Sequence, residues 1–418
     1  MAALIPPHGG ALRPLLLPAG EREEALKRAR TLKKLPLSTR EVSDLFMLAM
    51  GAYTPLAGFM GAADWRGACL EMRLESGLFW PLPVTLSCDE DAAVAAGDEV
   101  ALTDAGGEIL GILAVAETYA IDKALECHEV YRTTDAAHPG VAKVMAQGAV
   151  NLAGPVTVLS EGHFPETYRG LYLCPAETRA LFAGKGWSTV AAFQTRNPMH
   201  RSHEFLAKVG LQVCDGVLIH QVLGALKAGD IPAEVRVRAI DWLVANHFPE
   251  GRVIQAGYPI EMRYAGPREA LLHALFRQNF GCSHLVVGRD HAGLGDYYGP
   301  YDAQRIFDEI GADSLAIRPL KVDDTFHCFD CAGMATGNVC FAPDGGKERA
   351  SEEERHRAVA AVATGAAPGR PCREGDGGKL RISGTRLRAM FANAEAIPPE
   401  YSRDGVLAIL RAYYDRTP

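Results

Sequence analysis

The sequence predicts an α/β protein with a doubly wound parallel sheet, preceded by a β-rich region and followed by a small C-terminal region. Between residues 166 and 325, short apolar runs alternate with patterns of helical period, which is typical of strands buried in a parallel sheet. The runs are residues 189–193, 216–220, 252–256 and 284–287, and the helical patterns are residues 199–213, 233–247 and 267–280. Ligands of such sheets bind beyond the carboxyl ends of the strands, which directs attention to the segments after Phe193 and Val287.

The region before residue 166 has the character of a mixed or mostly β domain. Ser38 as N-cap, with Glu41 three residues later, predicts a capped helix over residues 38–50. Runs of apolar and β-branched residues then predict short strands over residues 84–88, 99–103 and 109–118. No cluster of chemically reactive residues stands out here, so we expect no catalytic group from this region.

The region after residue 325 differs again. It holds three clustered cysteines, a charged stretch rich in Gly, Ala and Pro over residues 344–378, and a final helical pattern. We expect residues 344–378 to form a mobile surface segment. Because a single core rarely grows beyond about 250–300 residues, we predict several domains. Their predicted limits are residues 1–165, 166–325 and 326–418.

Composition excludes several classes of protein. The 418 residues are 48% hydrophobic and 22% charged, as in ordinary globular proteins. The net charge of -8 argues against binding nucleic acid by bulk electrostatics, so an anionic substrate must be held by locally placed basic groups. No apolar run of about 18 residues is present, prolines interrupt the apolar N-terminal stretch, and most cysteines are scattered singly. We therefore expect a cytoplasmic protein without a membrane span.

The segment QTRNPMHRSHE, which begins at Gln194, is the first candidate site. Asn197 is a natural N-cap and Pro198 suits the first helical position, so we expect a helix whose free N–H groups face an anion in the crevice. Arg196 lies in the turn, where a guanidinium can bind phosphate or sulfate through two N–H groups. His200 and His203 are three residues apart and should be neighbours on one helix face. The alternative is that both histidines only pack or cap; a zinc pair is disfavoured because metalloprotease helices space the two histidines by four.

Two further segments carry basic residues that a purely structural turn or helix cap would not need. GRDHAG, from Gly288 to Gly293, follows the last predicted strand, and Arg289 and His291 offer cationic or hydrogen-bonding groups there. A tight structural loop is the alternative interpretation. In ISGTRLR, Ser383 or Thr385 can cap a helix. Arg386 and Arg388 in its first turns oppose the helix dipole, which favours a nearby anion over a plain capped surface helix.

The motifs that are absent narrow the chemistry. The sequence has no GxxxxGK[ST] phosphate loop, no complete GxGxxG after a strand, and no serine elbow or Cys/His pair for a covalent nucleophile. Two cationic turns without a nucleophile suit direct displacement at phosphorus, where catalysis consists mostly of positioning and charge stabilisation.

QTRNPMHRSHE, GRDHAG and ISGTRLR resemble the three signature segments of the ATP sulfurylase family, and HQVLGALKAGDIP and TPLAGFMGAADW extend the resemblance over essentially the whole chain. The resemblance implies a Rossmann-like nucleotidylyltransferase catalytic domain, a β-rich PUA-like N-terminal domain and a small C-terminal domain. It also implies a homo-oligomer. Because the sequence lacks a phosphate loop, we expect no fused adenylylsulfate kinase.

The activity implied by the resemblance is that of a sulfate adenylyltransferase: sulfate attacks the α-phosphorus of ATP in line and releases pyrophosphate, with Mg²⁺ present. Gln194, Arg196 and Arg289 would hold sulfate, helped by the backbone of Ala292. Thr195 and Asn197 would orient the α-phosphate, and His200 and His203 would stabilise charge in the transition state. The further substrate-binding candidates are Gly288, Asp290, His291, Ser383 and Arg388.

Two other functions are compatible with parts of the sequence. Another nucleotidylyltransferase, acting on an organic phosphate, would lack a dedicated pair of sulfate arginines, so Arg196 and Arg289 speak against it. An RNA-binding protein is disfavoured by net acidity and by the absence of a basic stretch interleaved with aromatic residues. We therefore expect the small molecules ATP, sulfate, adenylylsulfate and pyrophosphate as ligands, without nucleic acid. The sequence leaves open whether the reaction runs toward adenylylsulfate or toward ATP in the cell.

Cys328, Cys331 and Cys340 have the first spacing of a structural zinc site. Similar bacterial ATP sulfurylases place a histidine four residues after the third cysteine, and Asp344 occupies that position here. Other candidates for the fourth ligand are His327, His356 and Cys372. The alternative is three reduced thiols without a metal.

Overall fold

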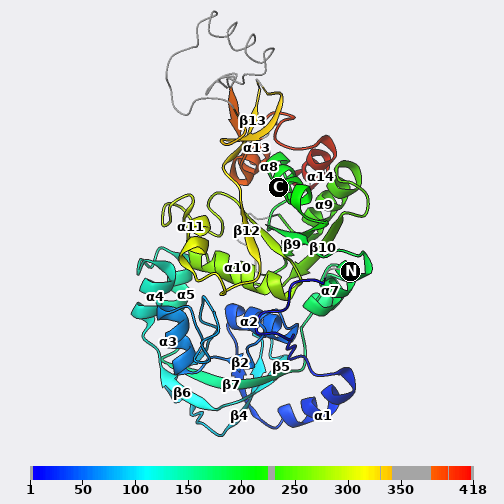
Figure 1. Cartoon of the computed structure of the whole chain (residues 1–418). Coiled ribbons are helices and arrows are strands. Elements are labelled where there is room, and N and C mark those ends of the chain that lie inside the picture. The colour runs from blue at the N-terminus through cyan, green and yellow to red at the C-terminus, as the bar shows by residue number, and fades with distance from the viewer. Residues whose placement is uncertain (1–2, 225–230, 330, 341–377, 394, 416–418) are drawn as a thin grey trace, which may run out of the picture. The chain divides into compact units, whose positions relative to one another are not determined.

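The computed structural model describes residues 3–224, 231–329, 331–340, 378–393 and 395–415, whose helices and strands are labelled in Figure 1. The chain divides into two compact units. Unit 1 consists of Met1–Arg196, Val213–Ala228 and Ile254–Leu320. Unit 2 consists of Asn197–Gln212, Gly229–Val253 and Lys321–Pro418.

The N-terminal part of unit 1 is built on a seven-stranded sheet in which β1, β4, β5, β7 and β2 follow in order, and β3 and β6 also pair with β7. Its strands are β1 (Lys33–Pro36), β2 (Gly58–Phe59), β3 (Leu86–Cys88), β4 (Glu99–Thr103), β5 (Ile109–Ala114), β6 (Glu117–Ala120) and β7 (Val150–Val158). The accompanying helices are α1 (Ala19–Ala29), α2 (Thr39–Ala49), α3 (Ala62–Leu70), the 3-10 turn η1 (Glu90–Ala92), α4 (Lys123–Tyr131), α5 (Pro139–Met145), α6 (Phe164–Thr167) and α7 (Pro175–Gly184).

Local signals predicted part of this region well. The capping box is confirmed, because Ser38 Oγ accepts from Glu41 N while the Glu41 carboxylate accepts from Ser38 N. The single strand predicted over residues 109–118 is wrong, since two strands, β5 and β6, occupy it. Their partner β7 is nine residues long and pairs with β5 through its second half and with β6 through its first half, so the chain must turn between them.

The second sheet of unit 1 confirms the predicted parallel architecture. Its strands follow in the order β10, β9, β8, β11, β12, and β8 pairs in parallel with both β9 and β11. The strands are β8 (Val190–Thr195), β9 (Gly216–Val222), β10 (Val253–Tyr258), β11 (His284–Val287) and β12 (Arg318–Lys321). Of the helices that alternate with these strands along the sequence, α10 (Pro267–Asn279) and α11 (Asp302–Glu309) belong to unit 1. Helices α8 (Arg201–Val213, except its last residue) and α9 (Ala233–His247) belong to unit 2. Sequence patterns missed β12, a four-residue strand with a basic residue at each end and no apolar run.

Helix α10 is buried along all thirteen of its residues, including its charged ones. The Arg268 guanidinium donates to the carbonyl oxygens of Ala68 and Cys69, and the Asn279 amide donates to Ala52 O and Thr54 O. These contacts fix α10 against the N-terminal part of unit 1, and Figure 1 shows α10 between α2 and the strands β9 and β10. Buried polar groups that are fully hydrogen-bonded specify one arrangement of the packed elements.

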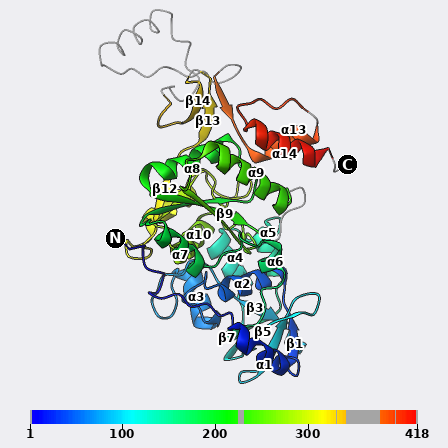
Figure 2. The same ribbon diagram turned by 90° about the vertical axis from the view of Figure 1, so that its right-hand side faces the viewer.

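Unit 2 contains an antiparallel three-stranded sheet in the order β14, β13, β15. Its elements are β13 (Thr325–Cys328), β14 (Gly333–Thr336), β15 (Lys379–Arg381), α13 (Gly384–Ala392) and α14 (Asp404–Tyr414), of which β13, β14, α13 and α14 are labelled in Figure 2. The segment predicted to be mobile, residues 344–378, lies outside the described residues except for residue 378. Within the described part of the chain, no helix has the length and apolar character that crossing a membrane requires.

Candidate active site

Two predicted site segments leave the same edge of the parallel sheet in unit 1. Strand β8 ends at Thr195 and is followed by Arg196, while β11 ends at Val287 and is followed by Gly288. The register pairs Ala191 with His284, so the carboxyl ends of these neighbouring strands lie together. This is the edge at which open parallel sheets bind ligands. The predicted grouping of the two turns is therefore confirmed within unit 1.

The first turn presents hydrogen-bond donors. Arg277, which is fully buried on α10, donates from Nη2 to Gln194 Oε1 at 2.7 Å. Because the amide oxygen faces Arg277, the Gln194 NH₂ group points away from that guanidinium; one N–H donates to Met262 Sδ at 3.6 Å, and the second can donate to an anion. Arg196 Nη1 donates to the Tyr264 hydroxyl at 2.6 Å, and Thr195 is buried at the end of β8. A glutamine amide and a guanidinium at one turn suit an oxyanion with several acceptor oxygens.

The second turn combines an exposed cation with a buried histidine contact. Among the described residues, none hydrogen-bonds the exposed Arg289 guanidinium. His291 Nε2 lies 3.0 Å from His273 Nδ1, and His273 Nε2 lies 3.5 Å from Glu269 Oε1. Burial, and then the neighbouring His273, hold the pKa of His291 well below its ordinary value, so this ring is neutral at pH 7. The turn that carries Arg289 is thus held from α10 by the hydrogen bond between His291 and His273, with the Glu269 carboxylate close to the other ring nitrogen of His273.

Backbone conformation distinguishes the same turn. Asp290 and Ala292 have φ of 54° and 56°, in the left-handed region that side chains with a Cβ rarely adopt. The Asp290 N–H donates to Pro300 O at 2.8 Å, and Ala292 O accepts from Gly266 N at 3.1 Å. Burial raises the pKa of Asp290, and the adjacent Arg289 opposes that rise. The two backbone hydrogen bonds of Asp290 and Ala292 hold this turn in its left-handed conformation.

In unit 2, the third predicted segment meets the beginning of the first. Arg388 Nη1 donates to Asn197 Oδ1 at 2.8 Å, and Gly384 also lies beside the Asn197 side chain. Ser383 caps α13 as predicted, because its Oγ accepts from Arg386 N. The prediction that Asn197 caps a helix starting at Pro198 is wrong: α8 begins at Arg201. Asn197 does not cap α8 because its amide oxygen, which a cap would need, accepts a hydrogen bond from Arg388 instead.

His200 and His203 are neighbours, although His200 precedes α8 rather than lying on it. Their rings stack with centroids 3.6 Å apart and planes 16° from parallel. Burial, reinforced by His203, holds the pKa of His200 well below its ordinary value. Burial also lowers the pKa of His203 to about 4, partly offset by a hydrogen bond to the Pro198 backbone. Both rings are therefore neutral at pH 7 in the unliganded protein.

We expect His203 to titrate near pH 4 in unliganded protein, instead of near 6.5 as in an unfolded chain. Because the folded pKa is the lower one, the neutral ring contributes stability that is complete above about pH 6.5 and is lost as the pH falls toward 4. A bound polyanion should raise the midpoint by favouring the charged ring. The ring C–H chemical shift, assigned with His203→Gln, measures both values, and an unliganded midpoint near 6.5 would contradict the expectation.

Cys328, Cys331 and Cys340 come together in unit 2, with their Sγ atoms all within 4.8 Å of one another. Cys331 N donates to Cys328 Sγ at 3.3 Å, a contact that favours a thiolate. His327 is not part of this cluster of described residues. Successive side chains on a strand point to opposite faces, so His327 faces away from Cys328 on β13. The other candidate ligands, Asp344, His356 and Cys372, lie outside the described residues.

Sequence reasoning missed the buried residues behind the first two turns. Tyr264 contacts Arg196, while Glu269, His273 and Arg277 support the turns from α10. The sequence did contain a signal for Glu269, His273 and Arg277, because their spacing of four residues places them on one face of a helix. Polar residues repeating along a helix face usually indicate a solvated surface, so no local pattern indicated that α10 is buried.

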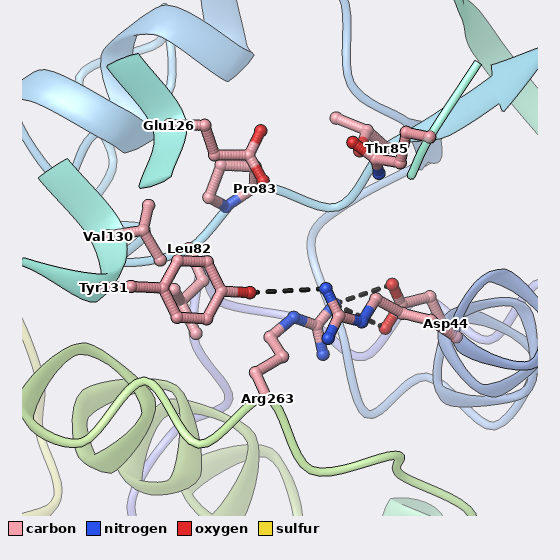
Figure 3. A pocket seen from close by; sticks show the side chains of 10 residues that line it. Asp44, Leu82, Pro83, Thr85, Glu126, Val130, Tyr131 and Arg263 are labelled. Atoms are coloured by element: carbon pink, nitrogen blue, oxygen red, sulfur yellow. Dashed lines mark hydrogen bonds and ion pairs between the residues drawn. The ribbon is translucent and has the colours of Figure 1, made fainter. Parts of the chain in front are cut away.

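A small enclosed cavity in unit 1 is a structural feature and not the substrate site. Arg40, Asp44, Glu126, Tyr131 and Arg263 are among its lining residues, as Figure 3 shows for the labelled members. About 10 Å³ is open to the centre of a water molecule, which is room for a single water. The buried ion pair that crosses it joins Arg263 Nη2 to the two Asp44 oxygens at 2.8 and 2.7 Å.

Comparisons with known proteins agree with this architecture and these motifs. The ATP-sulfurylase family model matches residues 169–370, and a PUA-like domain model matches residues 5–161. The sulfate adenylyltransferase of Psychrobacter sp. (strain PRwf-1) is 53% identical over 99% of this chain and 93% of its own length. That of Chlorobaculum tepidum is also 53% identical, over 99% of this chain and 95% of its own.

A solved structure described as a hexameric APS kinase from Thiobacillus denitrificans superposes with a TM-score of 0.71 at 27% identity, covering 98% of this chain and 68% of that one. The predicted fold class, a Rossmann-like catalytic domain with a PUA-like N-terminal domain, is confirmed by the two family models and the two sheets. Taken with the near-complete match to the curated relatives, these findings show that the chain belongs to the ATP-sulfurylase family.

Proposed function

We propose that this chain is a sulfate adenylyltransferase, which converts ATP and sulfate reversibly into adenylylsulfate and pyrophosphate. A sulfate oxygen forms a bond to the α-phosphorus as the bond from that phosphorus to the β-phosphate bridge oxygen breaks. Pyrophosphate leaves with the bonding electrons. The observation that carries the proposal, together with family membership, is the pair of cationic turns at the ends of the neighbouring strands β8 and β11.

Electrostatics explains why such a reaction needs these turns. Sulfate and the triphosphate both carry several negative charges, and two like unit charges 4 Å apart repel by about 4 kcal/mol at a protein surface. Arg196 and Arg289 each supply a permanent positive charge at this edge. The Gln194 NH₂ and the Ala292 backbone add uncharged donors, so sulfate can be held without the cost of further ion pairs.

The remaining proposed roles follow from the contacts in each unit. Thr195 and Asn197 would orient the α-phosphate, with Arg388 fixing the Asn197 amide through its 2.8 Å bond. The neutral His200 and His203 rings would donate N–H bonds to phosphate oxygens that gain charge in the transition state. Gly288, Asp290 and His291 would line the nucleotide site, and Ser383, as the cap of α13, would shape the loop beside Asn197.

Mg²⁺ belongs to this proposal as the partner of the ATP substrate. It neutralises triphosphate charge and makes pyrophosphate a better leaving group. The residues at the two turns of unit 1 are mainly cationic or amide donors, which suit anions and not Mg²⁺. We therefore assign Mg²⁺ to the nucleotide and name no protein ligand for it.

The test is pyrophosphate release from MgATP with and without sulfate, together with ATP formation from adenylylsulfate and pyrophosphate. Sulfate-dependent turnover in the first assay and ATP synthesis in the second are the expected results. Folded protein that turns over in neither direction would overturn the proposed activity.

The cysteine cluster fits a structural zinc ion. Tetrahedral coordination at about 2.3 Å from each sulfur places the sulfurs about 3.8 Å apart, which a cluster within 4.8 Å accommodates. Cys328 and Cys340 are buried and Cys331 is exposed, so three ligands close one side of the site. Zinc bound here would link β13 to the turn before β14 and stabilise the small sheet. Asp344 remains the proposed fourth ligand.

We expect purified protein to contain about one zinc ion per chain, and Cys328→Ser or Cys340→Ser to lose it, because a structural site requires all its ligands. Cys127→Ser is the matched control, since Cys127 is another buried thiol and lies outside the cluster. Elemental analysis after gel filtration measures the ratio. Protein grown in zinc-containing medium and purified without chelator, yet free of metal, would contradict the zinc assignment.

Three broader expectations belong to the same proposal. The division at residue 165 is supported by the family models, which match 5–161 and begin again at 169, whereas the ATP-sulfurylase model runs on to residue 370 and gives no support to the division at residue 325. A homo-oligomer is supported by the related structure, which is a hexamer, and light scattering measures the oligomeric state directly. A cytoplasmic location is proposed from the sequence, in which most cysteines are scattered singly.

A further inference from the structure

The loop between β10 and α10 in unit 1 is strained at a single aromatic residue. Tyr264 is buried with φ of 60°, a conformation that costs energy for a bulky side chain. Asp290 and Ala292 share this property, so three of the seven non-glycine positive-φ residues among those described belong to two loops that touch. Their contact is the bond from Gly266 N to Ala292 O. Strain of this kind persists only where the surroundings enforce it, and it collects at functional sites.

Hydrogen bonds on three sides hold Tyr264 in this conformation. Glu269, at the start of α10, accepts from Arg263 N at 2.9 Å and from Ala265 N at 3.0 Å, which are the residues on either side of Tyr264. His138 Nε2 lies 3.1 Å from the Tyr264 carbonyl oxygen. His138 Nδ1 accepts from Gly140 N, so its proton is on Nε2 and is donated to Tyr264.

The enforced conformation delivers the Tyr264 side chain to Arg196. The hydroxyl accepts from Arg196 Nη1 at 2.6 Å, and the guanidinium carbon lies 5.3 Å from the ring centroid. A carboxylate would orient the guanidinium equally well, but its negative charge would compete with an anionic substrate. A phenol orients the group while leaving its positive charge available.

We propose that Tyr264 is the positioning residue of the sulfate-binding Arg196. Held by Glu269 and His138, it fixes the plane of the guanidinium so that the remaining N–H groups meet a tetrahedral dianion. Tyr264 thereby sets the affinity for sulfate and leaves the affinity for ATP unchanged. This inference rests on the proposed function, in which Arg196 holds sulfate.

The test compares Tyr264→Phe with the wild type in sulfate-dependent pyrophosphate release. Phenylalanine keeps the ring and removes only the hydroxyl, so we expect KM for sulfate to rise about tenfold, as for one lost bond to a charged group, while KM for ATP changes by less than about twofold. Tyr119→Phe is the matched control, because its hydroxyl donates to Met60 O far along the sequence from both turns. We expect no change in either KM for the control.

A double variant isolates the pair. In an Arg196→Lys background, Tyr264→Phe should raise KM for sulfate by less than about twofold, because the interaction it removes is already lost. Wild-type protein without sulfate-dependent turnover would overturn the proposed function itself. If the wild type is active, three results for Tyr264→Phe would overturn the inference alone. These are an unchanged KM for sulfate, an equal rise of both KM values, and an equal effect in the Arg196→Lys background. The ratio of KM for sulfate to KM for ATP still tests the role of Tyr264 if Tyr264→Phe lowers the melting temperature, because partial unfolding does not change one KM selectively.

Discussion

Arg196→Ala is expected to lower kcat/KM for sulfate by about a thousandfold, the upper range for removing a single preorganised donor to a developing anion. Arg196 follows β8 at the ligand-binding edge of the sheet, and its guanidinium is oriented by Tyr264. Its loss removes both the charge that offsets repulsion between the substrates and the paired N–H groups that hold sulfate. Initial rates of pyrophosphate release at varied sulfate concentrations measure the effect.

Two variants control this experiment. Arg196→Lys keeps the charge but not the planar fork, so it should recover part of the activity. Arg318→Ala removes an exposed arginine from β12 in the same unit and should leave the kinetics unchanged. Sulfate-dependent turnover of Arg196→Ala within about threefold of the wild type would contradict the assignment of this arginine.

Asp44→Asn should lower the melting temperature by about 10 °C, because it leaves the buried Arg263 charge without its partner. Both side chains are almost fully buried, and Arg263 Nη2 contacts both Asp44 oxygens within 2.8 Å. An amide of the same size keeps the packing but supplies no counter-charge. The carboxylate also accepts from the Tyr53 hydroxyl at 3.3 Å. Differential scanning calorimetry measures the melting temperature.

The control for this prediction is an exposed ion pair of the same chemistry. Glu23 lies 3.2 Å from Lys27 with its side chain 83% exposed, so Glu23→Gln should shift the melting temperature by no more than about 1 °C. Replacing Asp44 and Arg263 together by leucine and methionine should restore much of the loss, since no unpaired charge then remains. A single Asp44→Asn variant as stable as the wild type would show that the pair is not needed.

Stability and catalysis are linked through the same loop. Arg263 precedes Tyr264, so its ion pair with Asp44 anchors the strained segment that reaches Arg196. The N-terminal part of the chain therefore contributes no group to the two turns, yet it supplies Asp44 and His138 that support them. These contacts give the β-rich region an indirect, supporting role at the first turn.

Much of the fold could be predicted from sequence because the signals are local. The strand and helix patterns from residue 189 to 287 correspond to β8–β11 and α8–α10, and Ser38 and Ser383 cap the helices that follow them. Caps and apolar periods depend on residues within about four positions of each other. The two turns at the sheet edge followed from the same reasoning, since parallel strands present their carboxyl ends together.

The errors have a common cause in distant partners. Asn197 has the residue type of a helix cap, but its amide oxygen is bound by Arg388, 191 positions away. Strand β12 has no apolar run, and it forms because it can pair with β11 at the edge of the sheet. Polar residues on α10 suggested nothing about burial, because their partners come from segments as distant as Ala52 and Ala68.

By itself the sequence determined the α/β class, the order of the elements, the three basic segments and the resemblance of those segments to the ATP sulfurylases. Only the tertiary structure decided how the side chains of those segments are held: Gln194 by Arg277, Arg196 by Tyr264, and the Tyr264 loop by His138 and Glu269. The physical reason is range. Helical period and capping are properties of a few neighbouring residues, whereas the pairing of Asp44 with Arg263 joins positions 219 residues apart and forms only when the chain has folded.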